Sequence, residues 1–272
     1  MSARVIGSGD DEYPAGFFDL EERPSFWLEG LLPDSPSVAV VGTRRCTRYG
    51  IDLAEAFGAV IARAGWTTVS GLARGIDTAA HRGCLRLSGG AVAILGSGID
   101  VCYPAENKPL YDQILTTGGG IVSEYPPGTP PDRWRFPARN RLIAALARAI
   151  VVVEAGPTGG ALITARLGAE MGRPVFAVPG DVDREMSEGC NRLIRDGAHP
   201  VLGSADLVEE LSLIIGPPAG AINADHGIPA EGVPVADLPA IWALTVTEAL
   251  IKLSRLELEG KVRRSGDLVV PG

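Results

Sequence analysis

Short apolar runs alternate with amphipathic stretches along residues 38–212 of the chain. The runs are rich in β-branched residues, which is typical of strands buried on both faces of a parallel sheet. Between them, apolar residues recur at the spacing of helices that pack on such a sheet. The alternation predicts a doubly wound α/β fold with a parallel sheet. The predicted strands are 37–41, 67–69, 91–95, 121–122, 150–153, 175–178 and 201–202, and the predicted helices are 47–64, 77–87, 107–115, 139–147, 162–171, 191–195 and 205–214.

The pattern changes on either side of this region. We predict an N-terminal extension over 1–37, which holds turn residues and scattered aromatics, followed by the α/β domain over 38–214. Residues 215–235 are rich in Pro, Gly and Ala without periodicity and are predicted to form a linker. The remaining residues, 236–272, are predicted to form a small separate domain.

This last part combines a helix signal with a hairpin signal. Thr245 and Glu248 have the spacing of a capping box, and Leu250 and Leu253 follow at helical spacing. Residues 261–270 then have the pattern of two strands joined by a turn. Helix and hairpin together resemble a truncated winged-helix module, for which DNA binding and protein interaction remain alternatives.

Composition places the chain among soluble globular proteins. Hydrophobic residues make up 46% and charged residues 21% of the 272 positions, which excludes disordered, collagen-like and disulfide-rich classes. No apolar stretch is long enough to span a membrane, and the N-terminus lacks the pattern of a signal peptide. The four cysteines are far apart and form no C-x-x-C, so we predict a cytoplasmic protein without a disulfide framework or metal site.

Net charge alone argues against nucleic-acid binding, because it is −8 at neutral pH. The distribution of arginine changes this picture. Residues 44–48 hold three arginines after the first predicted strand, and residues 133–148 hold five arginines and no acidic residue. Codon bias toward arginine would explain the composition but not the clustering. With Trp134 and Phe136 beside it, the second cluster suits a phosphodiester chain whose bases stack on aromatic rings.

Glycine loops follow almost every predicted strand. In a doubly wound sheet such loops lie at one edge, where backbone amides and helix N-termini bind anions. Two of them, 42–45 and 70–75, also carry arginine, which favours an anion site over turn formation alone. No G-x-G-x-x-G follows the first strand and no G-K-[ST] occurs, so the sequence predicts neither a dinucleotide cofactor nor ATP hydrolysis.

Other polar residues have catalytic and structural interpretations. Asp77 and His81 are spaced to share one face of a helix, but as a metal pair they lack further ligands. We expect Asp77 to cap the helix and a hydrogen-bonded His81 to orient the preceding loop. Glu124 and Glu154 follow predicted strands and are expected to anchor loops, with acid–base catalysis as the alternative. The lack of G-x-S-x-G argues against a serine hydrolase.

Several motifs together resemble the DprA/Smf family, also called DNA-processing protein A. The resemblance covers about 38–212 and is specific, because many motifs occur in order. The motifs are V-A-V-V-G-T-R-R (38–45), S-G-L-A-R-G-I-D-T-A-A-H (70–81), Y-P-A-E-N (103–107), S-E-Y-P-P-G-T-P-P (123–131), F-P-A-R-N-R-L-I-A (136–144), G-A-L-I-T-A-R (160–166), F-A-V-P-G (176–180) and G-C-N-R-L-I-R-D-G-A (189–198).

The resemblance implies a Rossmann-like fold that binds single-stranded DNA, forms a homodimer and loads the RecA recombinase onto incoming strands during natural transformation, without catalysis or a cofactor. It implies that Arg44 and Arg133 bind DNA and that Phe136 stacks a base. The further DNA-binding residues that it implies are Thr43, Arg45, Ser70, Gly71, Leu72, Arg139, Asn140, Arg141 and Gly160. In one departure, the family usually has a serine where this chain has Gly159 or Gly160.

Two other functions remain as alternatives. The glycine loop 154–160 is similar to that of lysine-decarboxylase-like phosphoribohydrolases, which cleave nucleoside monophosphates, although the spacing of their catalytic glutamate is missing. A scaffold that senses a nucleotide without turning it over is the other alternative.

Overall fold

The computed structural model describes residues 3–216, 228, 232–242, 244–258 and 261–271. The chain divides into two compact units, Met1–Gly216 and Pro217–Gly272, called here the α/β unit and the C-terminal unit. Among the described helices, none is long and apolar enough to cross a membrane.

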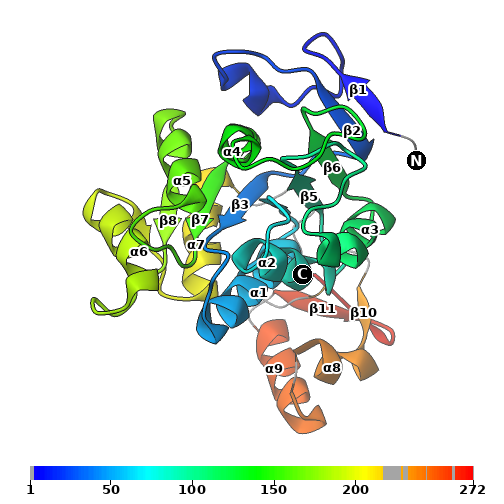
Figure 1. Cartoon of the computed structure of the whole chain (residues 1–272). Helices are drawn as coiled ribbons and strands as arrows, with labels where there is room; N and C mark the ends of the chain where they lie inside the picture. The colour runs from blue at the N-terminus through cyan, green and yellow to red at the C-terminus, as the bar shows by residue number, and fades with distance from the viewer. Residues whose placement is uncertain (1–2, 217–227, 229–231, 243, 259–260, 272) are drawn as a thin grey trace. The chain divides into compact units, whose positions relative to one another are not determined.

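A mostly parallel sheet runs through the α/β unit (Figure 1). Its parallel strands are β3 (Ser37–Val41), β4 (Thr67–Ser70), β5 (Ala91–Ile94), β6 (Gly120–Ser123), β7 (Ala149–Val152), β8 (Val175–Ala177) and β9 (His199–Pro200), and two antiparallel strands, β1 (Arg4–Ile6) and β2 (Phe26–Gly30), extend it beyond β6. The nine strands lie in the order β1-β2-β6-β5-β4-β3-β7-β8-β9. Strands β3 to β6 follow one another in one direction across the sheet, and β7 to β9 follow one another in the opposite direction. The strand order therefore reverses between the neighbours β3 and β7.

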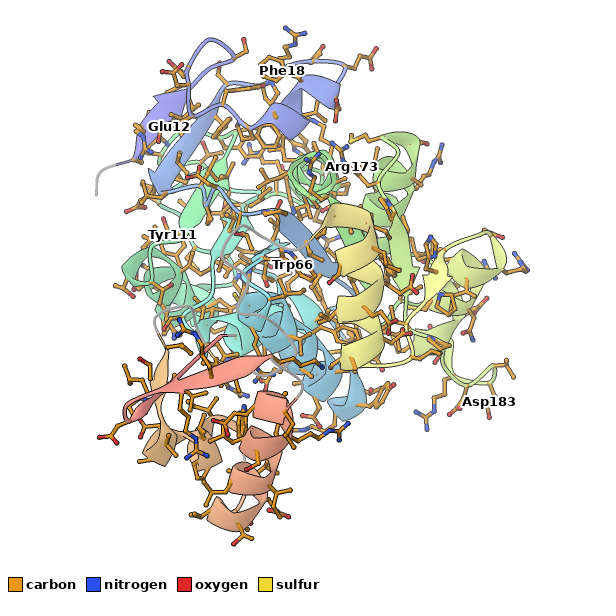
Figure 2. All side chains as sticks on the ribbon, turned by 180° about the vertical axis from the view of Figure 1, so that it is seen from behind. Glu12, Phe18, Trp66, Tyr111, Arg173 and Asp183 are labelled. Carbon is orange, nitrogen blue, oxygen red and sulfur yellow. The ribbon has the colours of Figure 1, made fainter. Side chains whose placement is uncertain are left out.

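Helices cover both faces of the sheet. They are α1 (Arg48–Arg63), α2 (Ile76–Leu85), α3 (Lys108–Thr116), α4 (Arg135–Leu146), α5 (Gly160–Glu170), α6 (Glu185–Arg195) and α7 (Ser204–Ile215), with short 3-10 helices η1 (Ala15–Asp19) and η2 (Ala105–Asn107). On one face, Val38 and Val40 of β3 share a core with Phe57 of α1 and Leu211 of α7. Trp66 is fully enclosed in this core, whereas Asp183 lies on the surface (Figure 2).

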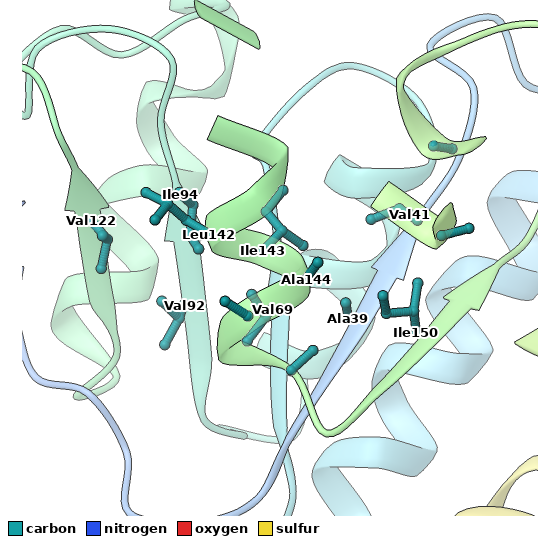
Figure 3. Packing of buried hydrophobic residues seen from close by; sticks show 14 of the residues in the cluster. Ala39, Val41, Val69, Val92, Ile94, Val122, Leu142, Ile143, Ala144 and Ile150 are labelled. Atoms are coloured by element: carbon teal, nitrogen blue, oxygen red, sulfur yellow. The ribbon is translucent and has the colours of Figure 1, made fainter. Parts of the chain in front are cut away.

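The alternate side chains of the same strands form the second core. Ala39 and Val41 of β3 point to the opposite face, because successive strand residues alternate between faces. Figure 3 shows α4 lying over this face, with Leu142 and Ile143 packed on the strands. This packing fixes α4, and with it the residues at its N-terminus, above the centre of the sheet.

The predicted doubly wound parallel sheet is confirmed, with corrections at its edges. Residues predicted as an N-terminal extension supply β1 and β2. Helix α4 begins at Arg135 rather than at 139. Pro137 is tolerated in its first turn, because the N–H groups of a first turn have no intrahelical partner and the N–H that proline lacks costs no hydrogen bond. Helix α6 also begins earlier, at Glu185 rather than 191, with acidic residues in its first turn that favour a helix N-terminus. The last strand is His199–Pro200, just before the predicted 201–202.

The C-terminal unit has its own small sheet and core. It holds β10 (Val233–Pro234), η3 (Val235–Asp237), α8 (Leu238–Trp242), α9 (Val246–Leu258), β11 (Val262–Ser265) and β12 (Leu268–Pro271), with strands in the order β10-β12-β11. The predicted capping box is confirmed: the Thr245 amide donates to a Glu248 carboxylate oxygen over 2.9 Å, and the Glu248 amide donates to the Thr245 hydroxyl over 3.3 Å. The predicted hairpin is also confirmed. The winged-helix assignment stays a prediction. Most of the predicted linker lies outside the described residues, but its end was placed too late, because residues 233–235 already form β10 and begin η3.

Candidate functional site

A cavity of about 530 Å³ opens at the carboxyl ends of β3 and β7, where the strand order reverses. Ligands of open α/β sheets bind at this position, because loops diverge there and helix N-termini face the opening. The lining comes mainly from the loop after β3 (41–45), the loop after β7 with the start of α5 (155–164), and the segment 133–143 that contains the start of α4. Figure 1 shows α4 and α5 on the same side of the sheet.

One wall of the cavity pairs an arginine with an aromatic ring. The guanidinium carbon of Arg44 lies 4.7 Å from the centre of the Phe136 ring, a cation–π contact. The Tyr103 ring lies 5.4 Å from Phe136, tilted by 35°. Behind them, a Cβ on Gly96 would lie 2.9 Å from Phe136 Cδ1, so a glycine is needed for the ring to seat against this loop. The wall therefore carries a positive charge stacked over one face of a flat apolar ring.

Three exposed arginines, Arg44, Arg45 and Arg133, line the cavity and are called here the rim arginines. Within the described residues, none of them forms an ion pair. Most arginines elsewhere on the unit do, as Arg166 with Glu170 and Arg192 with Glu188 show. The rim thus concentrates uncompensated positive charge on an acidic protein, as an anion-binding site requires.

A buried arginine forms part of the cavity lining. Arg139 is only 4% exposed, donates to the carbonyl of Ile94, and donates from Nε to Asn140 Oδ1 over 3.1 Å. Burial, together with the charge of Arg44, lowers the pKa of Arg139 to about 10, while the charge of Asp77 opposes this shift. A Cβ on Gly71 would lie 2.0 Å from this guanidinium, so any other residue there would displace the arginine side chain. The arginine side chain and the loop after β4 are therefore locked together.

The loop after β4 is held by polar side chains from beneath. Asp77 Oδ2 accepts the amides of Gly71 over 3.1 Å and Ala73 over 3.4 Å. Asn107 Nδ2 donates to the Leu72 carbonyl over 2.8 Å. Leu72 is buried with φ +56°, an uncommon backbone conformation for a large side chain, which these contacts enforce. The expectation that Asp77 caps the helix is wrong: the N-cap of α2 is Gly75, without a side-chain cap bond, and Asp77 lies inside the helix and bonds back to the loop. Burial raises the pKa of its carboxyl.

His81 differs from its prediction. Its side chain is fully buried, and neither ring nitrogen has a hydrogen-bond partner among the described residues. Burial, with the charge of Arg139 as a smaller cause, lowers its pKa to about 3, so the ring is neutral. The expectation of a hydrogen-bonded histidine is therefore wrong, and Asp77, not His81, bonds to the loop. The described part of the chain also contains no group of three or more His, Cys, Asp or Glu placed to hold a metal ion.

The start of α5 adds backbone donors to the cavity. Its N-terminus at Gly159 and Gly160 has no side-chain cap and no acidic residue in the first turn. Unpaired amides and the helix dipole make such an end favourable for an anion. Asn140 Nδ2 donates to the Gly160 carbonyl over 3.1 Å, which ties α5 to α4. The helix end and the rim arginines therefore border one space.

The two strand-end carboxylates are both engaged. Glu154 accepts the Thr47 hydroxyl over 2.6 Å and the Thr47 amide over 2.8 Å, which holds the loop after β3 to the end of β7. Glu124 forms an ion pair with Arg141, and burial raises the pKa of its carboxyl. Both therefore have the loop-anchoring contacts that the sequence led us to expect.

The structure brings most of the predicted binding residues together. Those that line the cavity are Thr43, Arg44, Arg45, Arg133, Phe136, Arg139, Asn140 and Gly160. Gly71 borders a smaller hollow of about 30 Å³ beside Arg44 and Phe136. Their contacts with DNA stay predictions.

Three predicted residues lie elsewhere. The Ser70 hydroxyl donates to the Val40 carbonyl over 2.7 Å, and Leu72 is buried in the core. Arg141, one position after Asn140, lies on a side of α4 away from the cavity and pairs with Glu124. Ser70, Leu72 and Arg141 are therefore placed to support the site rather than to line it.

Sequence reasoning missed some residues that line the cavity. Tyr103, Thr158 and Thr164 belong to it, although none was singled out as a binding residue. Tyr103 begins the motif Y-P-A-E-N, and Thr158 lies in the glycine loop after β7, so both had a usable signal. Thr164 had none, because its place depends on the packing of α5.

Comparison with known proteins decides the family. The family model described as DNA recombination-mediator protein A matches residues 4–212. The chain belongs to this family. The resemblance to the DprA/Smf family is thereby confirmed.

Curated relatives differ in how much of their length the chain spans. Protein Smf of Synechocystis is 45% identical over 212 residues, which cover 75% of this chain and 53% of that protein. DNA processing protein DprA of Streptococcus pneumoniae is 42% identical over 204 residues, covering 74% of this chain and 72% of that protein. The matched part is thus about half of the Synechocystis relative.

Two solved structures share the fold. The crystal structure of DNA processing protein A from Streptococcus pneumoniae superposes with a TM-score of 0.71 at 39% identity, covering 77% of this chain and 75% of that one. The Helicobacter pylori protein, described as having a unique single-stranded DNA binding mode, gives a TM-score of 0.70 at 28% identity, covering 78% of this chain and 96% of that one. The family acts in DNA processing and recombination.

Proposed function

We propose that the α/β unit binds single-stranded DNA without reading its sequence and acts in recombination by loading the RecA recombinase onto that strand during DNA uptake. Membership of the recombination-mediator family supports this proposal, as does the single-stranded DNA binding described for the Helicobacter pylori relative. The proposal depends most on one observation, the contact of Arg44 with Phe136 at the wall of a cavity that the rim arginines line.

The arginine–ring wall accounts for a preference for single strands. Arg44 neutralises a phosphate while the Phe136 ring stacks a base, and stacking contributes about 1–3 kcal/mol per base. In a duplex the bases are paired and stacked on each other, so Phe136 finds no free face. Single strands therefore gain a contact that duplexes lack.

The donors at the cavity account for binding that does not depend on sequence. They are the rim arginines and the backbone amides at the start of α5. Both types of donor suit phosphate oxygens, which are the same in every sequence. We therefore expect affinity to depend on salt concentration and strand state rather than on base composition.

We also propose that the site binds without turnover. Asp77 is the acidic residue that lines the cavity in the described part of the chain, and its Oδ2 is occupied by two loop amides. Glu154 is likewise bonded to Thr47. Release of adenine from AMP incubated with the protein would favour the phosphoribohydrolase alternative. Displacement of bound oligonucleotide by mononucleotides would favour nucleotide sensing.

Partner binding follows from the family resemblance. We propose that the protein acts as a cytoplasmic homodimer and contacts RecA directly. Light scattering tests the dimer, because a mass of one chain contradicts it. The rate at which RecA assembles on a single strand, with and without the protein, tests loading. An unchanged rate contradicts that part of the proposal.

A mobility-shift assay with a single strand and a duplex of equal length tests DNA binding. We expect Phe136→Ala to weaken single-strand binding roughly 5- to 150-fold, the equivalent of one lost stack, with little change for the duplex. Phe18→Ala is the matched control, because Phe18 also lies beneath an arginine, Arg23, but not at the cavity. Equal single-strand preference in wild type and Phe136→Ala contradicts stacking as the basis of selection.

A further inference from the structure

An aromatic cluster lies beside the cavity and is not part of its lining. It consists of Tyr125, Trp134 and Arg135 and is called here the Trp134 platform. The Arg135 guanidinium carbon lies 4.9 Å from the centre of the Tyr125 ring and 5.1 Å from that of Trp134, and the two rings meet edge to face with centres 6.2 Å apart. Trp134 is 59% exposed, and no other Phe, Tyr or Trp in the described chain is more exposed.

The exposed indole is held in place. Its Nε1 donates to Asp132 Oδ2 over 2.9 Å, while Arg135 also donates to the Pro130 carbonyl. Isolated exposed apolar residues are ordinary on a protein surface. A large ring that is both exposed and fixed by several contacts is different, because its side chain is already ordered and stacking a partner on it costs little side-chain entropy.

The platform begins the same helix as the cavity wall. Arg133 and Phe136 are three residues apart, so they share a side of the chain at the start of α4, and both line the cavity. Trp134 precedes Phe136 by two residues, which directs it to a different side. The exposed Arg133 therefore lies next to the platform in the chain and at the cavity at once.

We propose that the Trp134 platform is a second base-stacking site for the bound strand, which leaves the cavity past Arg133 and lays a further base on the exposed indole face. This inference rests on the proposed single-stranded DNA binding. The strand is continuous and every base has a flat face, so the platform is expected to accept any base. Affinity then increases with strand length beyond the length that fills the cavity.

A purely structural role predicts something different. If the cluster only fixes the segment between β6 and α4, removing the indole lowers the melting temperature and weakens binding of all strand lengths by the same factor. A stacking role predicts a defect confined to the longer strands. The dependence on length therefore separates the two.

The test is a series of oligodeoxythymidines of stepwise increasing length, bound to the full chain and to its Trp134→Ala and Trp134→Phe variants. Tyr49→Ala serves as control, because Tyr49 is 56% exposed and lies outside the cavity lining and the platform. We expect wild-type affinity to increase again once the strand is longer than the length that fills the cavity. At those longer lengths Trp134→Ala is expected to bind roughly 5- to 150-fold more weakly than wild type, and Trp134→Phe is expected to retain most of the wild-type affinity. Tryptophan fluorescence quenched by long strands in wild type but not in Trp134→Phe would give independent support.

The outcomes separate the two proposals. If wild type binds no single strand of any length, the proposed function fails. If wild type binds and Trp134→Ala matches it at every length, the platform is wrong and the proposed function stands. A uniform loss at all lengths with a lower melting temperature also overturns the platform. If Trp134→Ala does not fold, the fluorescence comparison between wild type and Trp134→Phe decides, and equal quenching contradicts the platform.

Discussion

Two arginine–phenylalanine contacts of nearly equal geometry occur in different regions of the α/β unit. Arg44 lies 4.7 Å from the centre of the Phe136 ring at the cavity, and Arg23 lies 4.9 Å from that of Phe18 in the N-terminal segment. Figure 2 shows Phe18 on the outside of the molecule. The contact is the same, so it cannot by itself define a site.

The surroundings of the two pairs differ. Phe18 packs edge to face on Tyr13, with ring centres 5.1 Å apart, in a segment that adds strands to the sheet edge. Phe136 instead borders a cavity with further arginines and the amide end of α5. A cation–π pair becomes a candidate binding site where the fold adds a concave surface and uncompensated charge around it.

The largest expected effect concerns the buried arginine of the cavity. Arg139→Ala leaves the buried Asp77 without the positive charge that favours its ionised form and opens a space against Gly71, so we expect a loss of about 3–5 kcal/mol in the free energy of unfolding. Arg166→Ala, which breaks an exposed pair with Glu170 on the outer face of α5, is expected to cost at most about 1 kcal/mol. Urea unfolding measures both. Equal, small losses would contradict the distinction between the two regions.

The buried His81 makes the stability of the α/β unit depend on pH. Its folded-state pKa is about 3 against an ordinary 6.5, so between these values the unfolded chain binds more protons and stability falls as pH falls. From pH 7 to pH 5 this one group is expected to cost about 2 kcal/mol. The difference in unfolding free energy between wild type and His81→Leu, measured with urea at each pH, isolates the contribution of His81 from that of the titrating carboxyl groups. Parallel stability curves for the two proteins would contradict a buried, neutral histidine.

The smallest expected effect comes from adding a donor to the cavity. A Cβ on Gly160 would have Asn140 Nδ2 as its neighbour at 3.4 Å, an ordinary contact, so Gly160→Ser fits without rearrangement. A hydroxyl there can donate to a phosphate, and we expect single-strand affinity to rise about two- to tenfold. Filter binding measures this effect. Unchanged affinity would mean that the phosphate does not approach this end of α5.

The sequence predicted the central strands of the sheet well and the strands at its edge poorly. Strands such as β3 and β7 are buried on both faces and leave continuous apolar runs that are easy to recognise. Strands β1 and β2 mix polar and apolar residues and pair antiparallel at the edge, so their sequences resemble those of loops. The sequence placed an anion site at the edge of the sheet where the strand-end loops lie, and the cavity opens at that edge. Its position along the edge depends on the strand order, which the sequence did not predict.

The sequence indicated which residue types form the site, but it did not indicate the role of every residue in it. Arg139 and Arg141 look alike in sequence, yet one is buried in the cavity lining and the other pairs with Glu124. Their roles depend on where α4 begins, and Pro137 in its first turn concealed that start. The unpartnered state of His81 depends on packing between elements far apart in the chain, which no local pattern reports.

The salt dependence of single-strand affinity tests the central claim most directly. Wild type, Arg44→Ala, Arg133→Ala and the control Arg23→Ala are compared by plotting the logarithm of Kd against the logarithm of salt concentration. Each rim arginine that neutralises a phosphate contributes about one to the slope, so we expect the two rim variants to lose about that much and Arg23→Ala to keep the wild-type slope. A wild-type slope in both rim variants, or an equal loss in Arg23→Ala, would contradict the assignment of DNA binding to this cavity.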